Sequence, residues 1–253
     1  MISRTLLGVL TPSSNTVMEP LCAEILADTP DISAHFGRFR VTEIALSDAA
    51  LGQFDNVPQL QAADLLADAR MDVIAWGGTS GSWVGPDSDR RLCEQITERA
   101  VVPATTSTLA LFEAFRALGM SNYALVTPYL DEVQTAIVTT FAGEGLHCVA
   151  EQHLGDRGNF SFSEYSETQI ASMVRDVARA KPEVFVIHCT NFLGARIAPK
   201  LEEELNIPVI DSTSVTLWHM LHLAKADASR IRGWGRIFDL APAARHEDQT
   251  KTG

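Results

Sequence analysis

Short hydrophobic runs alternate along the chain with longer stretches in which apolar residues recur every three or four positions. The short runs predict buried strands, and the longer stretches predict amphipathic helices. Predicted strands cover 4–10, 32–41, 71–76, 101–107, 123–128, 146–152, 184–189 and 207–211. Predicted helices cover 16–28, 59–70, 86–100, 108–118, 130–143, 167–180, 194–205 and 214–224. Strands that alternate with helices of this length predict βαβ units and parallel sheets.

The second half of the chain repeats features of the first. Thr11-Pro12 opens one predicted helix, and Thr127-Pro128 opens another 116 residues later. The segments 101–115 and 206–220 share the spacing P-x-x-[TD]-[TS]-[ST]. Any two parallel βαβ units share a strand–helix alternation, but this common spacing favours an internal duplication.

A duplication predicts an α/β fold of two pseudo-symmetric lobes, each with a parallel sheet flanked by helices. The duplication aligns Gly78-Thr79 with Cys189-Thr190. The first pair follows the predicted strand 71–76, and the second lies at the end of the predicted strand that begins at Val184. The predicted division of the chain is an N-terminal lobe from 1–112 and 214–240, a C-terminal lobe from 113–213 and a flexible tail from 241–253.

Composition and charge narrow the class of protein. Hydrophobic residues make up 46% of the 253 residues and charged residues 21%, which is typical of a globular chain. The formal net charge is −12 and there is no basic stripe, so we expect no nucleic-acid partner. No apolar run approaches the roughly 20 residues that cross a bilayer. The N-terminal run leads into a Pro/Ser/Asn turn without a cleavage pattern, so we expect no membrane partner and a cytoplasmic location.

Hydroxyl, amide and glycine residues gather where the predicted strands end. Ligands of open parallel sheets bind beyond these carboxyl ends. Several of the segments also precede helices, whose first N–H groups bind anions. Each segment alone is explained by ordinary helix capping, but together they favour a small-carboxylate site without lysine or arginine. The segments are 11–16, 77–82, 104–108, 127–129, 189–191 and 211–214.

Cys189 differs from the other cysteines, because it ends an apolar strand and precedes a Thr-Asn turn. That position exposes a thiol to helix N–H groups, which lower a thiol pKa. Cys22 and Cys93 lie on predicted helices and Cys148 lies mid-strand, so we expect these three to pack in the interior. His188 adjoins Cys189, but neighbouring strand residues point to opposite faces, which disfavours a Cys–His pair.

These motifs resemble those of known enzymes. LGVLTPSSNTVMEP resembles the opening of the maleate cis-trans isomerase family, GGTS a loop of the arylmalonate decarboxylases, and HCTN the second cysteine segment of both. Both families belong to the aspartate/glutamate racemase superfamily, and the resemblance extends from about residue 6 to residue 220. It implies two pseudo-symmetric lobes with the active site in the cleft between them, and makes a homo-oligomer plausible.

The resemblance also implies roles for particular residues. Cys189 matches the second of two cysteines that face each other across the substrate, and Gly78 stands at the first, as in arylmalonate decarboxylase. Thr79 and Ser80 match residues that stabilise an enediolate. The implied substrate-binding residues are Pro12, Ser14, Asn15, Tyr129, Asn159, Thr190 and Asn191. Ser13 and Ser14 stand where the decarboxylase has prolines, which puts an aryl substrate in question.

The leading hypothesis is a decarboxylase without cofactor that acts on a small di-acid or substituted malonate through an enediolate, with Cys189 delivering the proton. The alternative is a maleate-type cis-trans isomerase, which the Asn15 motif favours and Gly78 opposes. A non-catalytic carboxylate-binding protein and hydantoin-type racemisation or hydrolysis stay open as further hypotheses. We expect no metal, nucleotide or flavin, because GGTSGS lacks both the Rossmann glycine spacing and the Walker lysine.

Overall fold

A computed structural model describes residues 4–47, 52 and 56–243. It contains two four-stranded parallel sheets, ordered β2-β1-β3-β4 and β6-β5-β7-β8. The first sheet comprises β1 (Thr5–Pro12), β2 (Ile32–Phe39), β3 (Val73–Trp76) and β4 (Ala104–Thr106). The second comprises β5 (Asn122–Thr127), β6 (His147–His153), β7 (Val184–Ile187) and β8 (Val209–Asp211). The two orders are identical after a shift of four strands, which confirms the duplicated two-lobed α/β fold.

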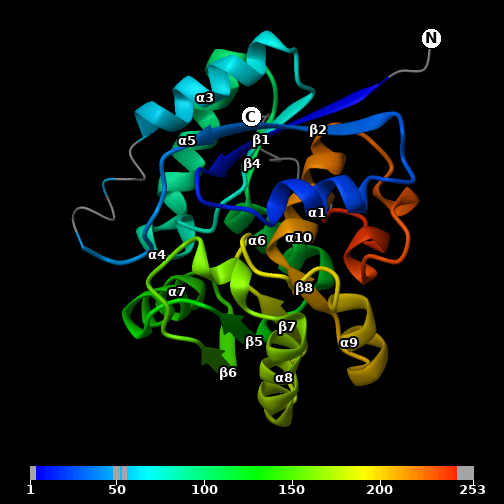
Figure 1. Ribbon diagram of the computed structural model, residues 1–253. Coiled ribbons are helices and arrows are strands. Elements are labelled where there is room, and N and C mark those ends of the chain that lie inside the picture. The colour runs from blue at the N-terminus through cyan, green and yellow to red at the C-terminus, as the bar shows by residue number, and fades with distance from the viewer. Residues whose placement is uncertain (1–3, 48–51, 53–55, 244–253) are drawn as a thin grey trace, which may run out of the picture.

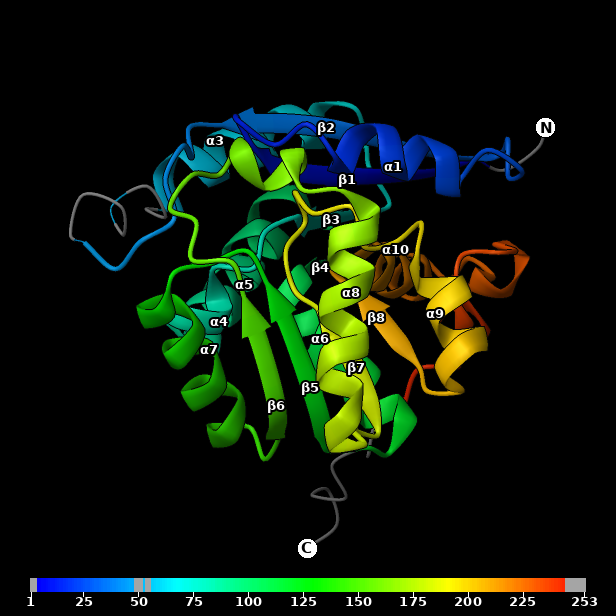
Figure 2. The same cartoon turned by 60° about the horizontal axis from the view of Figure 1, so that its bottom comes forward.

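Helices cover both sheets. Along the first lobe run α1 (Met18–Ile25), α3 (Asn56–Asp68), α4 (Gly81–Val84), α5 (Pro86–Ala100) and α6 (Ser107–Leu118). The rest are α7 (Asp131–Gly143), α8 (Glu167–Val177), α9 (Ala198–Leu205) and α10 (Ser212–Leu223). Figure 1 shows the first sheet above the second, with α6 and α10 between them. Figure 2 shows α8 lying across one face of the second sheet.

The central strands β1, β3, β5 and β7 are hydrophobic because helices cover both of their faces. Leu7, Val9 and Leu10 of β1 are fully buried, as is every residue of β7. Such continuous burial favours the β-branched and apolar runs that the sequence shows. The carboxyl ends of these four strands point toward the space between the lobes.

The repeated spacing at 101–115 and 206–220 is explained by two matching helix starts. Thr106 ends β4 and its hydroxyl accepts the N–H of Leu109, at 3.0 Å. Asp211 ends β8 and its carboxylate accepts the N–H groups of Thr213 and Ser214. In each lobe the last strand thus ends on an N-cap side chain that starts the next helix.

α10 follows the second sheet in sequence but packs against α6 and against β3 and β4 of the first sheet. This placement agrees with assigning 214–240 to the N-terminal lobe, while the division 1–112 plus 214–240 against 113–213 stays a prediction. Of the expected tail 241–253, residues 244–253 lie outside the described part of the chain. Within the described ranges, no helix combines the length and the apolar character needed to span a membrane.

Several predicted elements needed correction. The strand expected over 101–107 shrinks to β4, because Val101 ends α5 in the left-handed region with φ 56°. The helix expected from residue 194 begins at Ala198, and α4 was not predicted at all. Cys148, expected in the interior, is only partly buried, because β6 is an edge strand of its sheet. Cys22 is fully buried on α1, as expected.

Candidate active site

A cavity of about 280 Å³ lies where β1, β3, β5 and β7 end. Sequence analysis gave eleven catalytic or substrate-binding candidates, and eight of them line this cavity. The other three, Ser14, Asn15 and Asn191, lie in the surrounding hydrogen-bond network. Hydroxyl, amide, thiol and aromatic side chains make up most of the wall, and no lysine or arginine is among them. The lining residues are Pro12, Val41, Ile44, Trp76, Gly78, Thr79, Ser80, Trp83, Tyr129, Asn159, Cys189 and Thr190.

Cys189 follows β7 and is only 3% exposed. The backbone N–H of Asn191 points at its sulfur, with an N–Sγ distance of 3.4 Å, and the Tyr129 hydroxyl also contacts it. The sequence predicts a lowered thiol pKa here, and that prediction is wrong. Burial raises the pKa of Cys189 to about 12 and outweighs the lowering by the Tyr129 and Asn191 donors. The thiol therefore carries its proton at neutral pH, as a general acid must.

Two hydroxyl groups stand beside the thiol. Thr79 Oγ1 lies 2.7 Å from the Tyr129 hydroxyl, and both residues are buried. Burial, followed by the neighbouring Cys189 thiol, raises the pKa of Tyr129 well above its usual value, so this phenol is a neutral donor. Trp83 packs edge-on against Tyr129, with ring centroids 5.3 Å apart, and fixes the ring. The pair can direct an O–H group at negative charge that develops in the cavity.

Gly78 carries no side chain, and the indole of Trp76 fills the space beside it. A Cβ built on Gly78 would overlap the six-membered ring of Trp76. The Trp76 Nε1–H donates to Ser80 Oγ at 3.0 Å, so the Ser80 hydroxyl proton stays available for another acceptor. This wall thus offers hydroxyl donors but no group that exchanges a proton with carbon.

Asn15 lies just outside the cavity. Its Oδ1 accepts the N–H groups of Val17 and Met18 at 3.0 and 2.9 Å, and so caps the start of α1. Its Nδ2 donates to Thr190 Oγ1 at 3.2 Å, and Thr190 in turn donates to the Gly77 carbonyl. In this arrangement Asn15 orients Thr190, and its expected direct contact with a substrate carboxylate stays a prediction.

A second chain of hydrogen bonds joins the lobes. Asn159 lines the cavity and donates through Nδ2 to Ser14 Oγ at 2.9 Å. Asn191 Nδ2 donates to the Asn159 carbonyl at 2.6 Å, and Asn191 Oδ1 accepts the Thr16 N–H at 2.9 Å. Ser14 donates to the Val41 carbonyl at 2.6 Å. Ser14 and Asn191 therefore hold the walls of the cavity together and do not line it.

His188 takes no part in the cavity, as its strand position predicts. Its Nε2 lies 2.7 Å from Ser82 Oγ, and its ring packs edge-on against Phe141. Burial lowers the pKa of His188 to about 3, so the ring is neutral. Among the described residues, no group of three or more His, Cys, Asp or Glu side chains is placed to hold a metal ion.

The sequence analysis missed Val41 and Ile44 as cavity residues. They follow the edge strand β2, in a loop that pairs with a distant segment through a bridge between Glu43 and Gly158. The Ile44 N–H donates to the Arg157 carbonyl at 3.1 Å in the same place. Val41 ends the predicted strand 32–41, and Ile44 opens the apolar run Ile44-Ala45-Leu46, so neither differs locally from a residue of the core.

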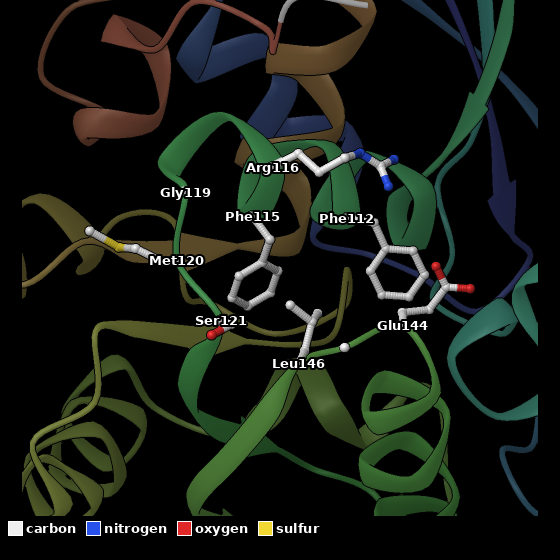
Figure 3. Close-up of a pocket in the computed structure, with 9 residues that line it drawn as sticks. Phe112, Phe115, Arg116, Gly119, Met120, Ser121, Glu144 and Leu146 are labelled. Atoms are coloured by element: carbon white, nitrogen blue, oxygen red, sulfur yellow. The ribbon is translucent and has the colours of Figure 1, made fainter. Parts of the chain in front are cut away.

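A second, larger cavity lies at the opposite edge of the C-terminal sheet, beside the amino ends of β5 and β6. Figure 3 shows Phe112, Phe115 and Leu146 forming its wall. Its charged side chains are engaged elsewhere, because Arg116 pairs with Glu113 and Glu144 pairs with Arg90. No set of polar groups converges on this cavity, so it is not the candidate active site.

Comparison with known proteins agrees with this geometry. A sequence model described as arylmalonate decarboxylase matches residues 15–238, which is most of the chain. The chain belongs to the arylmalonate decarboxylase family. The arylmalonate decarboxylase of Bordetella bronchiseptica is 25% identical over 92% of this chain and 96% of its own length. The maleate isomerase of Nocardia farcinica is 23% identical over 91% of this chain and 94% of its own length.

Solved structures share the fold. The maleate isomerase of Pseudomonas putida S16, determined with maleate, superposes with a TM-score of 0.84 at 23% identity, covering 95% of this chain and 99% of its own. A Nocardia farcinica maleate cis-trans isomerase with a covalently bound succinylcysteine intermediate superposes with a TM-score of 0.85 at 23% identity. The match covers 92% of this chain and 98% of that chain. A liganded variant of arylmalonate decarboxylase superposes with a TM-score of 0.81 at 22% identity, and the match covers 93% of this chain and 99% of that chain. The chain is accordingly an enzyme of this family, and a lyase or an isomerase activity fits it.

Proposed function

We propose that the protein is a cofactor-independent decarboxylase of a small di-acid or substituted malonate. The observation that carries the proposal is a protonated thiol, Cys189, that lines the same cavity as Gly78, a position without any acid–base group. One-sided protonation of a carbanion needs this arrangement. A two-base racemase needs a proton-exchanging group on both sides.

In the proposed reaction the cavity takes up the dicarboxylate and the C–C bond to one carboxylate breaks, so that CO₂ leaves. The bonding electron pair stays on the remaining carbon and carboxylate as an enediolate. Hydroxyls of Thr79, Ser80 and Tyr129 donate to its oxygens, where such preorganised donors lower the barrier by several kcal/mol. The Cys189 S–H proton then passes to the carbon, and water reprotonates the thiolate.

Cis-trans isomerisation of a maleate-like substrate is the second candidate. The structural likeness to maleate isomerases supports it, including one that carries a succinylcysteine intermediate. Addition of a cysteine to a C=C bond requires a thiolate nucleophile. The raised pKa of Cys189 opposes this route, because the thiolate form is scarce at neutral pH. The first cysteine position is moreover occupied by Gly78.

Proton NMR separates the two candidates. The protein is incubated with maleate and, separately, with methyl-, vinyl- and phenylmalonate, and CO₂ release is measured in parallel. Decarboxylation predicts CO₂ and a monocarboxylate from at least one malonate, whereas isomerisation predicts fumarate from maleate. Fumarate without CO₂ would overturn the proposal.

Cysteine variants assign the proton donor. Cys189→Ala should lower turnover at least about 10³-fold, because it removes the acid, while thermal unfolding stays close to that of the parent protein. Cys148→Ala is the matched control, since Cys148 is half-buried on β6 and outside the cavity. Unchanged activity of Cys189→Ala would refute its role. Association into a homo-oligomer and a cytoplasmic location stay predictions.

A further inference from the structure

Trp76 is one of two tryptophans in the wall of the active-site cavity. It ends β3 and is 1% exposed, although the cavity lies beside it. The next two residues are glycines, and the indole folds back over this turn into the space that a side chain of Gly78 would take. Trp76 therefore limits the room beside Gly78 in the cavity that Cys189 also lines.

Three contacts hold this indole in one orientation. Its Nε1–H donates to Ser80 Oγ at 3.0 Å. Its ring packs against Phe39, with centroids 4.8 Å apart and planes inclined by 44°. Its edge meets the Gly78 backbone, where no Cβ keeps it away. A ring fixed from three directions is a rigid wall, because any other rotamer would leave a buried indole N–H without an acceptor.

The rest of the cavity offers no compensating room. Val41, Ile44 and the second tryptophan, Trp83, supply the other apolar parts of the wall, so bulky side chains line the cavity on more than one side. Two carboxylates and the carbon between them already need the polar part of the cavity. A substituent on the reacting carbon must fit between Trp76 and the thiol.

We propose that Trp76 is the specificity-determining residue of this enzyme, and that it restricts the substrate to dicarboxylates whose reacting carbon bears a substituent smaller than a phenyl ring. This inference rests on the proposed decarboxylase function and names its substrate class. A phenyl ring needs space that the indole takes beside Gly78, whereas a methyl or vinyl group needs less of it. Through its bond to Ser80, the same indole also orients one of the hydroxyl donors.

Vinylmalonate and phenylmalonate are the matched probes, because both substituents delocalise carbanion charge and they differ mainly in size. For the parent protein we expect kcat/KM for vinylmalonate to exceed that for phenylmalonate at least about 100-fold. Replacing Trp76 by leucine should shift this ratio at least about 100-fold toward phenylmalonate, since one methylene in a tight pocket already changes selectivity about 10–200-fold. Trp76→Phe keeps an aromatic wall but loses the bond to Ser80, so it should lower kcat for vinylmalonate with a much smaller shift in the ratio.

Binding to the Cys189→Ala variant, measured by calorimetry, tests the size limit without turnover. Vinylmalonate should bind more tightly than phenylmalonate, and adding Trp76→Leu should reverse or abolish that preference. Equal turnover or equal binding of the two probes by the protein with Trp76 would overturn the inference. So would a ratio unchanged in both Trp76 variants. Size-selective binding without CO₂ release would instead refute the decarboxylase function and leave Trp76 as the size limit.

Discussion

Replacing Tyr129 by phenylalanine removes one oxygen atom from the centre of the site and leaves the ring in place. The lost hydroxyl lies 2.7 Å from Thr79 Oγ1 and contacts the thiol of Cys189. Leaving the buried Thr79 hydroxyl without this partner should cost about 1–3 kcal/mol in the free energy of unfolding. Removing one donor of this kind from a developing oxyanion should lower kcat by about 10²–10³-fold.

The same variant has a signature at the thiol. Because the Tyr129 hydroxyl lowers the pKa of Cys189 within a site whose burial raises it to about 12, its loss should raise that pKa further. Alkylation of Cys189 by iodoacetamide, followed by mass spectrometry from pH 8 to pH 11, should then be slower at each pH than in the parent protein, because only the thiolate reacts. A variant that merely loosened the fold would be alkylated faster.

Tyr123→Phe is the control for this experiment. Tyr123 is a buried phenol of β5, and its hydroxyl lies by Cys148 and away from Cys189. Its removal should leave both kcat and the alkylation of Cys189 unchanged. If Tyr129→Phe behaved like Tyr123→Phe in both measurements, the assignment of Tyr129 as a donor in the site would be wrong.

Two further predictions concern stability. Asn191→Ala removes the amide that accepts from Thr16 and Val17 and donates to the Asn159 carbonyl, so urea unfolding should show a loss of about 2–4 kcal/mol in the free energy of unfolding. Asn191→Asp keeps the acceptor oxygen and loses only the donor, so its loss should be smaller, and equal losses in the two variants would contradict this assignment of the bonds. Burial raises the pKa of Asp89 from 3.8 to about 7, with Thr106 as its hydrogen-bond donor, so the folded state binds a proton more tightly than the unfolded state does. The stability that protonated Asp89 contributes is complete below pH 3.8 and is lost as pH rises through 7. The free energy of unfolding should therefore fall by about 3 kcal/mol between pH 5 and pH 8. Asp89→Asn should flatten that decline, and parallel pH curves for the two proteins would refute it.

Most of the fold could be predicted from sequence because hydrophobic periodicity depends on local burial. The helix 86–100 was predicted with its observed bounds, since Pro86 starts it and the apolar stripe runs unbroken to Ala100. The four residues of α4 are too few to show a period, and they form a helix only where the chain turns around Gly78. The late start of α9 was missed although Pro199 stands in its first turn, the same signal that Pro86 gives for α5.

The candidate site, too, could be predicted only where local sequence determines position. Residues directly after strand ends could be located, because parallel strands bring their carboxyl ends to one edge. Val41 and Ile44 could not, because their position depends on pairing with residues 157 and 158 far along the chain. Nor did the sequence reveal that the Trp76 ring covers Gly78, since that depends on a rotamer fixed by Phe39 and Ser80.

The error in the predicted thiol pKa leads to the strongest argument about mechanism. Local donors stabilise a thiolate, but burial opposes any charge in the cavity, and here burial prevails. The same environment, with no lysine or arginine in the wall, also destabilises a bound carboxylate. Loss of CO₂ removes that carboxylate and passes its charge to the enediolate, which becomes a single carboxylate once Cys189 has delivered its proton, whereas isomerisation keeps both carboxylates in place. Burial thus supports both halves of the proposed reaction, because it destabilises the carboxylate that leaves as CO₂ and keeps on Cys189 the proton that the enediolate takes up.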